Sequence, residues 1–364
     1  MVARLDANPS VIWQFACPIC QAALLSSSPY TNAAPDRGDP PWSPAPSHTD
    51  ASRSPTMPEG NGFARCEGCC RTFQYSSGIW RFLPEQRAER FEGFLREYQI
   101  VRTHEGWGTS HAAYYHRLPS VDRNDPQREI WRIRAKSFAS LLDRVVQPRE
   151  AQLGRPMTIL DLGAGNCWLS YRLAERGHQV AAVDVSTSAA DGLGAHVWYG
   201  PAVRFTPVQA EFDHLPFSAE QADLVLFNAS LHYSADCAVT LTEARRVLRP
   251  DGRVVIMDSP VYDDATSGEQ MVHERQSEYE RKYGFRSDAL RSESFLTMAR
   301  LDELAAAVGI RWDIHTPFYG VGWLLRPWRA RLRGHRQPAR MPLIVGRLLS
   351  GKASAAGAGP YATV

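Results

Sequence analysis

The chain of 364 residues lacks any apolar run approaching the roughly 18–20 residues that a membrane-spanning helix needs. Its start, from Met1 to Phe15, has no basic region followed by an apolar stretch, so we expect no secretory signal and a cytoplasmic protein. Cysteine is scarce, with seven residues, which argues against a disulfide framework in the cytoplasm and favours a search for metal-ligand spacing. Hydrophobic residues make up 44% of the chain and charged residues 22%, which excludes a chain that is disordered throughout.

Acidic residues are absent from Ile314 to Val364, although this stretch carries seven arginines and one lysine. The formal net charge of the whole chain is +2, and the basic end contributes +8 of it, which leaves −6 for the first 313 residues. The near-neutral total therefore hides an acidic body and a strongly basic carboxyl-terminal stretch.

Two segments are poor in residues that form a core. Residues 26–60 hold eight prolines among Ser, Thr, Asp and Gly, with Trp42 as the only large side chain expected to anchor them. Such a composition buries too little apolar surface to offset its ordering entropy, so we expect a disordered insertion. Residues 353–364 are small and glycine-rich, and we expect a frayed tail.

Short apolar runs alternate with helix-like stretches after Pro156. The runs are Thr158–Leu162, Val180–Val185, Val203–Val208, Asp223–Phe227 and Arg253–Met257. Continuous apolar strands separated by helices predict an α/β fold with a parallel sheet covered on both faces. Helical spacing of apolar residues also predicts helices at 85–105 and 127–146, before the sheet.

A glycine-rich turn follows the first of these strands, in the order Asp161-Leu-Gly163-Ala-Gly165. Glycine lets the backbone approach a ligand closely, because no Cβ stands in the way. A dinucleotide-binding turn needs a third glycine where this chain has Trp168, and Asp161 would repel a pyrophosphate. The turn therefore argues against nicotinamide or flavin binding and suits a ligand that carries a positive charge.

The second strand ends in Asp184, about 20 residues downstream, where a carboxylate can accept hydrogen bonds from a ribose diol. The third strand leads into Glu211-Phe212-Asp-His-Leu-Pro-Phe, and the fourth into Asn228-Ala-Ser-Leu-His232. Before the fifth strand, Pro-Asp-Gly ends a helix.

Taken together over residues 156–259, these motifs resemble a class I S-adenosylmethionine-dependent methyltransferase with a type 11, ubiquinone-biosynthesis-like core. The resemblance implies a Rossmann-like sheet of seven strands with helices on both faces and an antiparallel edge hairpin, formed by residues 310–315 and 341–347. It implies S-adenosylmethionine as cofactor. The implied cofactor-binding residues are Asp161, Gly163, Ala164, Gly165 and Asn166 at the methionine end, Asp184 and Val185 at the ribose, Glu211 and Phe212 at the adenine, and Asn228 near the methyl group. The chain departs from the pattern at Cys167, where many members have a third glycine.

Two C-x-x-C pairs, Cys17 with Cys20 and Cys66 with Cys69, predict one structural zinc ion held by four thiolates. The long separation of the pairs is explained by the proline-rich insertion, and Cys70 is a spare ligand beside Cys69. Unrelated thiols or a redox pair are the alternatives. The aromatic strand and Phe-Leu-Pro after the second pair resemble the zinc ribbon that precedes some methyltransferase domains, such as ribosomal RNA guanine methyltransferases.

His232 is the candidate general base, because it follows the fourth strand at the sheet edge where ligands bind. The alternative is a histidine at a helix start that packs beside Tyr233. The chain has no Asn-Pro-Pro-Tyr at this edge, which argues against methylation of an exocyclic adenine amine or a glutamine amine. It has no Pro-Cys there either, which argues against pyrimidine C5 methylation.

The acceptor is left open by the motifs. Residues 262–298 predict an inserted cap with a helix at 268–285, and a loop at 320–340 carries Trp323, Trp328 and several arginines toward the ligand edge. This loop suits RNA, an acidic small molecule or an anionic lipid surface, or is simply solvated. The predicted organisation is a zinc-ribbon module at 1–84, a helical lid or connector at 85–148, a methyltransferase domain at 149–352 with its cap, and the tail.

Three functions follow from this organisation. The first is a methyltransferase acting on a small or medium-sized acceptor, for which we favour an anionic one. The second is a ribosomal or transfer RNA base methyltransferase that grips RNA with the ribbon and the basic loop. The third is a non-catalytic adenosylmethionine-binding scaffold, against which the presence of Asp161, Gly163, Gly165 and Asp184 argues.

Overall fold

A computed structural model describes residues 13–26 and 62–349 of the chain. The predicted insertion, apart from Ser26, and the predicted frayed tail at 353–364 lie outside the described residues.

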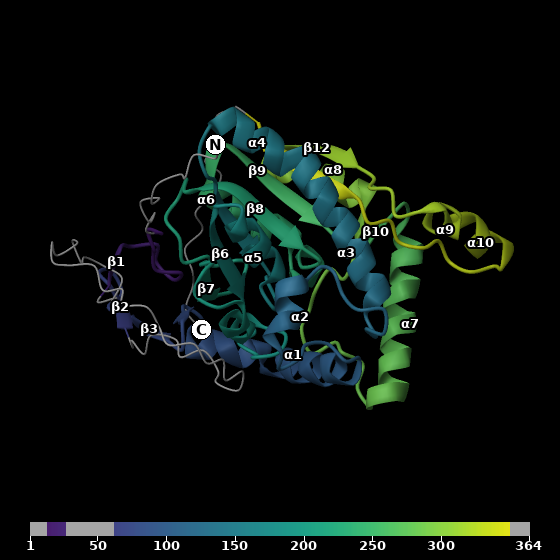
Figure 1. The fold of residues 1–364 in the computed structure, drawn as a ribbon, viewed down its shortest axis with the longest axis horizontal. Helices are drawn as coiled ribbons and strands as arrows, with labels where there is room; N and C mark the ends of the chain where they lie inside the picture. Colours follow the sequence, from purple (N-terminus) through teal and green to yellow (C-terminus); the bar gives the residue numbers. More distant parts are fainter. Residues whose placement is uncertain (1–12, 27–61, 350–364) are drawn as a thin grey trace, which may run out of the picture.

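One eleven-stranded sheet forms the centre of the molecule (Figure 1), in the order β1-β2-β3-β4-β7-β6-β5-β8-β9-β13-β12. Its strands are β1 Leu24–Ser26, β2 Gly62–Cys66, β3 Thr72–Ser76, β4 Ile79–Arg81, β5 Thr158–Leu162, β6 Gln179–Asp184, β7 Thr206–Gln209, β8 Ala222–Asn228, β9 Leu248–Met257, β12 Ile310–His315 and β13 Leu343–Leu348. The seven strands from β7 to β12 confirm the predicted methyltransferase sheet. Its third strand begins three residues later than predicted.

The predicted edge hairpin is present. β13 runs antiparallel to both β9 and β12, so it lies between two strands that share the direction of the central sheet. The sixth strand has the predicted bounds, whereas the seventh begins at Leu343 rather than Met341. The carboxyl ends of β5, β6, β7, β8, β9 and β12 therefore meet at one edge of the sheet.

Helices cover both faces of the sheet, as predicted. Successive residues of β5 alternate between two buried clusters, Ile159 in one and Leu160 and Leu162 in the other, because neighbouring side chains of a strand point to opposite faces. The first face is covered by α3 Arg128–Leu141, a π-helical turn Leu142–Val146, α4 Gln147–Leu153, α5 Trp168–Glu175 and a 3₁₀ segment Leu193–Tyr199. The second face is covered by α6 Cys237–Val247 and α8 Met298–Val308.

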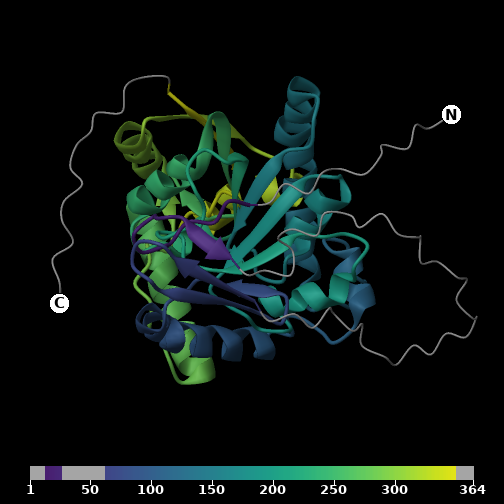
Figure 2. The same cartoon turned by 90° about the vertical axis from the view of Figure 1, so that its left-hand side faces the viewer.

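The amino-terminal module is part of the same sheet, which the sequence did not indicate. β4 pairs in parallel with β7 through Trp80 opposite Val208 and Arg81 opposite Gln209. Its aromatic side chains, including Phe73, Trp80 and Phe82, belong to the buried cluster on the second face. Figure 2 shows these short strands lying alongside the central sheet. The module and the core thus share one set of backbone hydrogen bonds and one hydrophobic cluster.

The remaining helices surround the ligand edge. They are α1 Glu85–His104, α2 Ala112–Arg117, α7 Ala265–Tyr283, α9 Val321–Leu324 and α10 Arg326–Leu332. The helix α3 continues without interruption through the π-helical turn into α4, so the predicted boundary at 148/149 lies within one continuous helical segment. The predicted cap helix is α7, and a two-stranded parallel pair, β10 Val261–Tyr262 with β11 Leu296–Thr297, closes the base of the cap.

Among the described helices, none has the length and apolar character needed to cross a membrane.

Candidate active site

A pocket lies at the carboxyl ends of β5, β6, β7 and β8, and residues of α1 form part of its wall. Figure 1 shows α1 below these strands. The carboxyl edge of the strands is where ligands bind in open α/β sheets. Of the predicted cofactor residues, those that line the pocket are Gly163, Gly165, Asp184, Val185, Glu211 and Phe212. Asp161, Ala164 and Asn166 are buried, and Asn228 is half-buried at the end of β8; these four do not line the pocket.

The glycine turn has the backbone shape that its sequence predicts. Gly163 has φ of +76° and Gly165 has φ of +52°, both in the left-handed region. A Cβ on Gly163 would lie 2.3 Å from the Cβ of Ser230, whereas a Cβ on Gly165 would meet nothing closer than 4.0 Å. The first glycine is therefore required by packing, and the second leaves room for a ligand.

The backbone conformation at Cys167 shows how the turn accommodates a residue other than glycine. It has φ of +64°, so it adopts the left-handed conformation that glycine would adopt more easily at this position. Its thiol is buried. The turn thus keeps the shape of a three-glycine turn without the third glycine.

Asp184 lies at the pocket wall and is tied to the turn. Its Oδ2 accepts a hydrogen bond from the Gly165 amide at 2.8 Å, and its Oδ1 accepts one from the Ser186 amide at 2.7 Å. Burial raises the pKa of Asp184 to about 6, against the opposing effect of these amides. A half-buried carboxylate held in this way fits the donor set of a ribose diol, which offers two hydroxyl groups.

Asp161 lies behind the turn, fully buried. Its Oδ2 accepts a hydrogen bond from the Ser170 hydroxyl at 2.7 Å, and its Oδ1 has no partner among the described residues. Burial raises the pKa of Asp161 to about 7, with the charge of Asp184 adding to the effect. A buried carboxylate with an unpaired oxygen favours a cationic group nearby, which fits the positive ligand predicted from the sequence.

Glu211 has a partner that the sequence did not indicate. Both of its carboxylate oxygens accept from the guanidinium of Arg87 in α1, and the Nη2–Oε2 distance is 2.7 Å. The pair connects α1 to the end of β7. Next to it, Phe212 packs against Phe227, and Asp213, which sequence reasoning passed over, also lines the pocket. Asp213 follows the third strand at the ligand edge, and this position in the sequence could have identified it as a pocket residue.

His232 is buried in a 3₁₀ turn, Leu231–Tyr233, and does not line the pocket. Its ring lies 4.6 Å from the ring of Tyr233, and its Nδ1 is 3.3 Å from the hydroxyl of Ser259. This is the packing beside Tyr233 that was the alternative to a catalytic role. Burial and the positive charge of Arg275 lower the pKa of His232 to about 3, so the ring holds a proton poorly, which argues against a general base.

Arginine and tryptophan side chains stack on one another next to the pocket. Arg102 of α1 lies over the ring of Trp107 at 3.5 Å and forms an ion pair with the buried Asp191, which lines the pocket. Arg134 lies 5.2 Å from Trp107 on one side and 4.8 Å from Trp131 on the other. No motif of the sequence indicated Arg102 or Asp191.

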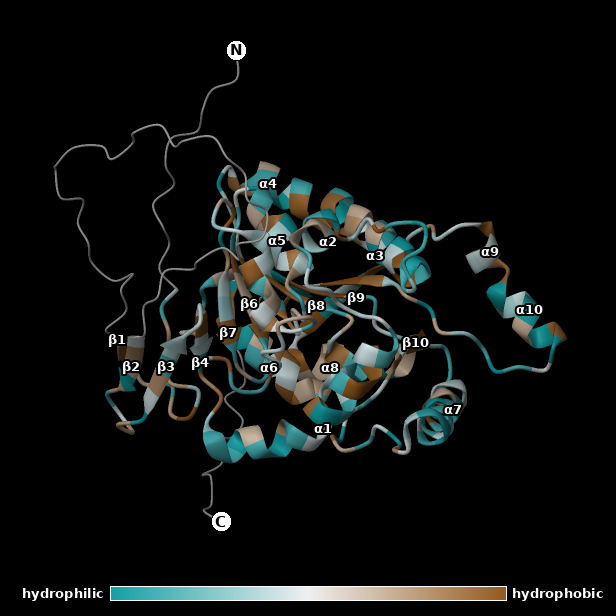
Figure 3. Cartoon of the chain, turned by 60° about the horizontal axis from the view of Figure 1, so that its bottom comes forward, coloured by the Kyte–Doolittle hydropathy of each residue, from teal (hydrophilic) through white to brown (hydrophobic). Residues whose placement is uncertain are grey.

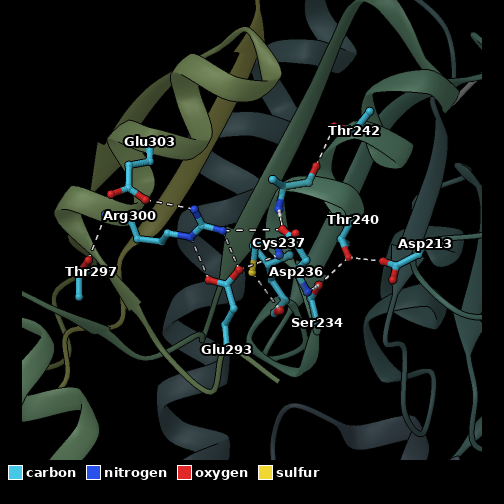
Figure 4. A network of polar contacts seen from close by, with 12 residues as sticks. Asp213, Ser234, Asp236, Cys237, Thr240, Thr242, Glu293, Thr297, Arg300 and Glu303 are labelled. Atoms are coloured by element: carbon cyan, nitrogen blue, oxygen red, sulfur yellow. Dashed lines mark hydrogen bonds and ion pairs between the residues drawn. The ribbon is translucent and has the colours of Figure 1, made fainter. Parts of the chain in front are cut away.

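A polar network fastens the far wall of the pocket (Figure 4). Arg300 of α8 donates to both carboxylate oxygens of Glu293, at 2.9 and 3.1 Å, and Glu293 in turn accepts from the Cys237 amide at the start of α6. The Glu293 amide donates to the carbonyl of Ser234, a pocket residue. The segment that carries Leu290 and Arg291 into the pocket is thereby fixed to the loop after β8.

The basic stretch 320–340 leaves the sheet at the ligand edge, as predicted, but contributes no residue to the pocket. Arg336 pairs with Glu274 at 2.7 Å, and Arg340 pairs with Asp263 at 2.8 Å, both in the cap. The stretch is thus joined to the cap and not to the cofactor pocket.

The four predicted zinc ligands come together. The sulfur atoms of Cys17, Cys20, Cys66 and Cys69 all lie within 4.8 Å of one another, with 3.6 Å between Cys17 and Cys69 and 3.4 Å between Cys20 and Cys66. A tetrahedral zinc ion with Zn–S bonds of about 2.3 Å places its sulfur ligands about 3.8 Å apart. Cys70 lies outside this cluster, so the spare ligand is not needed.

Part of the chain is similar to known methyltransferases. Residues 160–256 match the family described as a methyltransferase domain. A malonyl-[acyl-carrier protein] O-methyltransferase of Hahella chejuensis is 30% identical over 110 residues, which are 28% of this chain and 36% of that protein. An uncharacterized methyltransferase of Mycobacterium tuberculosis is 38% identical over 96 residues, 26% of this chain and 37% of that protein.

Among solved structures, the 1,6-didemethyltoxoflavin-N1-methyltransferase of Burkholderia thailandensis matches with a TM-score of 0.43 and 19% identity, covering 84% of this chain and 99% of that one. The matched part of the chain spans little more than a third of the length of the curated relatives. The stretch from β5 to β9, which holds the glycine turn, Asp184, Glu211 and Asn228, thus matches the methyltransferase domain family, in agreement with its motifs.

Proposed function

We propose that the protein is an S-adenosylmethionine-dependent methyltransferase that acts on a small or medium-sized, anionic acceptor. The observation that carries the proposal is the pocket at the carboxyl ends of β5 to β8, where Gly163, Gly165 and Asp184 meet. The match of residues 160–256 to a methyltransferase domain supports it.

The residues present fit the cofactor. Asp184, with Val185 beside it, would hold the ribose, and the open space at Gly165 would admit the methionine end, near Asp161, Ala164 and Asn166. Glu211 and Phe212 would face the adenine. Because Arg87 occupies both oxygens of Glu211, this carboxylate would bind an adenine amine only by sharing or exchanging its partner.

The cofactor supplies a methyl group activated by a sulfonium. The chain's own contribution is positioning, because an in-line displacement gains most from a correct approach of the two reactants. Asn228 and Ser230, at the end of β8, would form the wall near the transferred group; the Ser230 hydroxyl donates to the Leu162 carbonyl at 2.5 Å and so is fixed in place. With His232 buried outside the pocket and only weakly basic, an acceptor that is already nucleophilic fits this site better than one that must lose a proton first.

Two cationic side chains of the pocket wall support an anionic acceptor. Arg90 and Arg291 line the pocket. Neither forms a salt bridge with a carboxylate in residues 13–26 or 62–349, unlike Arg87 and Arg102. A guanidinium group without a carboxylate partner favours a carboxylate or phosphate ligand.

The cofactor is tested by calorimetry with S-adenosylmethionine. We expect Asp184→Ala to weaken binding at least about a hundredfold, since a carboxylate hydrogen-bonded to two hydroxyls is lost. The matched control is Asp122→Ala, which removes an exposed carboxylate that pairs only with Arg117. Equal binding by wild type and Asp184→Ala, or no binding by wild type, would contradict the proposal.

The acceptor is tested by transfer of a labelled methyl group into fractionated extracts. Label in the small-molecule fraction supports the proposal. Label in the RNA fraction alone would favour an RNA base methyltransferase instead. Binding of the cofactor without transfer to any fraction would favour a non-catalytic scaffold.

We also propose that Cys17, Cys20, Cys66 and Cys69 hold one structural zinc ion, because their sulfur atoms have the spacing of a tetrahedral site. The ion would fasten the two cysteine-bearing loops of the amino-terminal module to each other.

A further inference from the structure

The connection from β12 to β13 is long and contains two short helices. We call residues 318–333 the projecting segment; it contains α9 and α10. Figures 1 and 3 both show these two helices extending away from the body of the molecule, beyond α7. The ion pairs of Arg336 and Arg340 with the cap hold the base of this segment.

The projecting segment has an exposed apolar face. Val321, Leu324, Leu325, Trp328 and Leu332 follow one another at i, i+3, i+4, i+7 and i+11, the spacing of a single helix face. The helical winding continues across the junction of α9 and α10, because Leu325 has helical backbone angles and its carbonyl accepts from the Arg329 amide at 3.0 Å.

These five side chains are between 39% and 67% exposed, and Phe318 at the start of the segment is 62% exposed. Single exposed apolar residues are common on protein surfaces, but an apolar face of five is not. No described element of the chain covers this face.

The flanks of the apolar face are basic. Arg329, Arg331 and Arg333 are exposed, and none pairs with a carboxylate of the described residues. No acidic residue occurs in the sequence from Ile314 onward to oppose them. The segment therefore combines a continuous apolar stripe with uncompensated positive charge.

We propose that the projecting segment docks on an anionic lipid surface, with the apolar stripe entering the boundary of headgroups and acyl chains. Helices that lie in a membrane interface have this composition, with Leu and Trp on one face and Lys or Arg on the other. The arginines contact lipid phosphates, and the attraction to anionic lipid adds to the burial of the stripe.

The charge and the stripe disfavour other partners. A second copy seated on this face would bring arginines against arginines at close range. Nucleic acid would satisfy the arginines, but four of the five stripe residues are aliphatic and offer no ring on which a base stacks. The inference does not depend on the methyltransferase proposal.

The test is sedimentation of the full chain with lipid vesicles. We expect binding to vesicles that contain about one-third phosphatidylglycerol and much weaker binding to pure phosphatidylcholine. Trp328→Ala with Leu332→Ala, and separately Arg329→Glu with Arg333→Glu, should each weaken binding at least about tenfold. The matched controls are Val239→Ala, an exposed apolar residue of α6, and Arg123→Glu, an exposed arginine elsewhere.

Circular dichroism of each variant checks that it is folded. Absence of binding to anionic vesicles, or equal binding to both kinds of vesicle, would overturn the proposal. It would also be overturned if the stripe variants converted a dimer to a monomer, or if the arginine variants abolished RNA binding, while vesicle binding stayed the same.

Discussion

At the scale of single residues, the site is governed by two carboxylates that the fold places in a poorly solvated region. Asp161 and Asp184 end neighbouring parallel strands, so the register of β5 with β6 brings them to the same edge. Burial raises the pKa of each, to about 7 and about 6, because a buried carboxylate loses solvation; the charge of Asp184 adds to the effect at Asp161, and that of Asp191 adds to it at Asp184. The free protein thus carries negative charge at a cost in stability, as a site for a cation requires.

The pH dependence of stability follows from Asp161. The folded state holds its proton up to about pH 7, whereas the unfolded chain releases it near the ordinary value of 3.8. The folded state then binds more protons between these values, so the free energy of unfolding falls as the pH rises through this window. We expect Asp161→Asn to remove most of this fall and to be more stable than wild type at pH 8 by about 2–4 kcal/mol.

This is measured by urea unfolding at pH 5 and pH 8 without cofactor. Ser170→Ala is the companion variant, because it removes the hydroxyl that donates to Asp161, a contact that lowers the pKa of this carboxyl, and should steepen the fall. If Asp161→Asn retained the pH dependence of wild type, the carboxylate would not be the group that titrates.

At the scale of elements, the strands and the motif-bearing turns could be predicted from the sequence. The contacts that these elements make with the rest of the chain could not. β5 and β12 have the predicted bounds because uninterrupted apolar runs and flanking turn residues mark them. A helical lid or connector was predicted at 85–148, and residues of α1 line the pocket, but the helical spacing of its apolar residues does not show which of them face a ligand. The pair of Arg87 with Glu211 joins residues 124 positions apart, and no local pattern reveals it.

The network around Arg300 shows how an element outside the motifs acts on the site. Its guanidinium holds Glu293, and Glu293 fixes the segment that carries Leu290 and Arg291 to the pocket. We expect Arg300→Ala to weaken S-adenosylmethionine binding about three- to tenfold, because Glu293 would lose its charged partner and the segment would lose its fixed position.

Calorimetry with the cofactor checks this, with Glu303→Ala as the matched control. Glu303 also contacts Arg300, at 3.1 Å, but its side chain is mostly exposed and it holds no pocket residue, so we expect unchanged binding. If Arg300→Ala lowered thermal stability alone and left cofactor affinity intact, the network would have no influence on the pocket.

At the scale of the whole molecule, the cysteine module and the catalytic core are one sheet. The sequence indicated a separate ribbon, because two knuckles and a turn suffice to define one. Nothing in the three residues of β4 shows that this strand will pair with β7. The pairing depends on free backbone groups of β7 at the edge of the core sheet. The amide of Phe82 extends the contact by donating to the Gln209 carbonyl at 2.8 Å. β7 then leads directly into Glu211 and Phe212 at the pocket.

This continuity connects the proposed zinc site to the proposed cofactor pocket. We expect about one zinc ion per chain, and its removal by a strong chelator should lower the melting temperature by about 5 °C or more and weaken S-adenosylmethionine binding, because β4 would no longer support β7. Cys69→Ser should reproduce both effects. Cys70→Ser is the matched control, since it changes the adjacent thiol, which lies outside the four-sulfur cluster. Metal analysis that finds no zinc, or equal loss of zinc in the two variants, would contradict the assignment. Loss of zinc with unchanged cofactor affinity would show instead that the ion stabilises the module without acting on the pocket through β7.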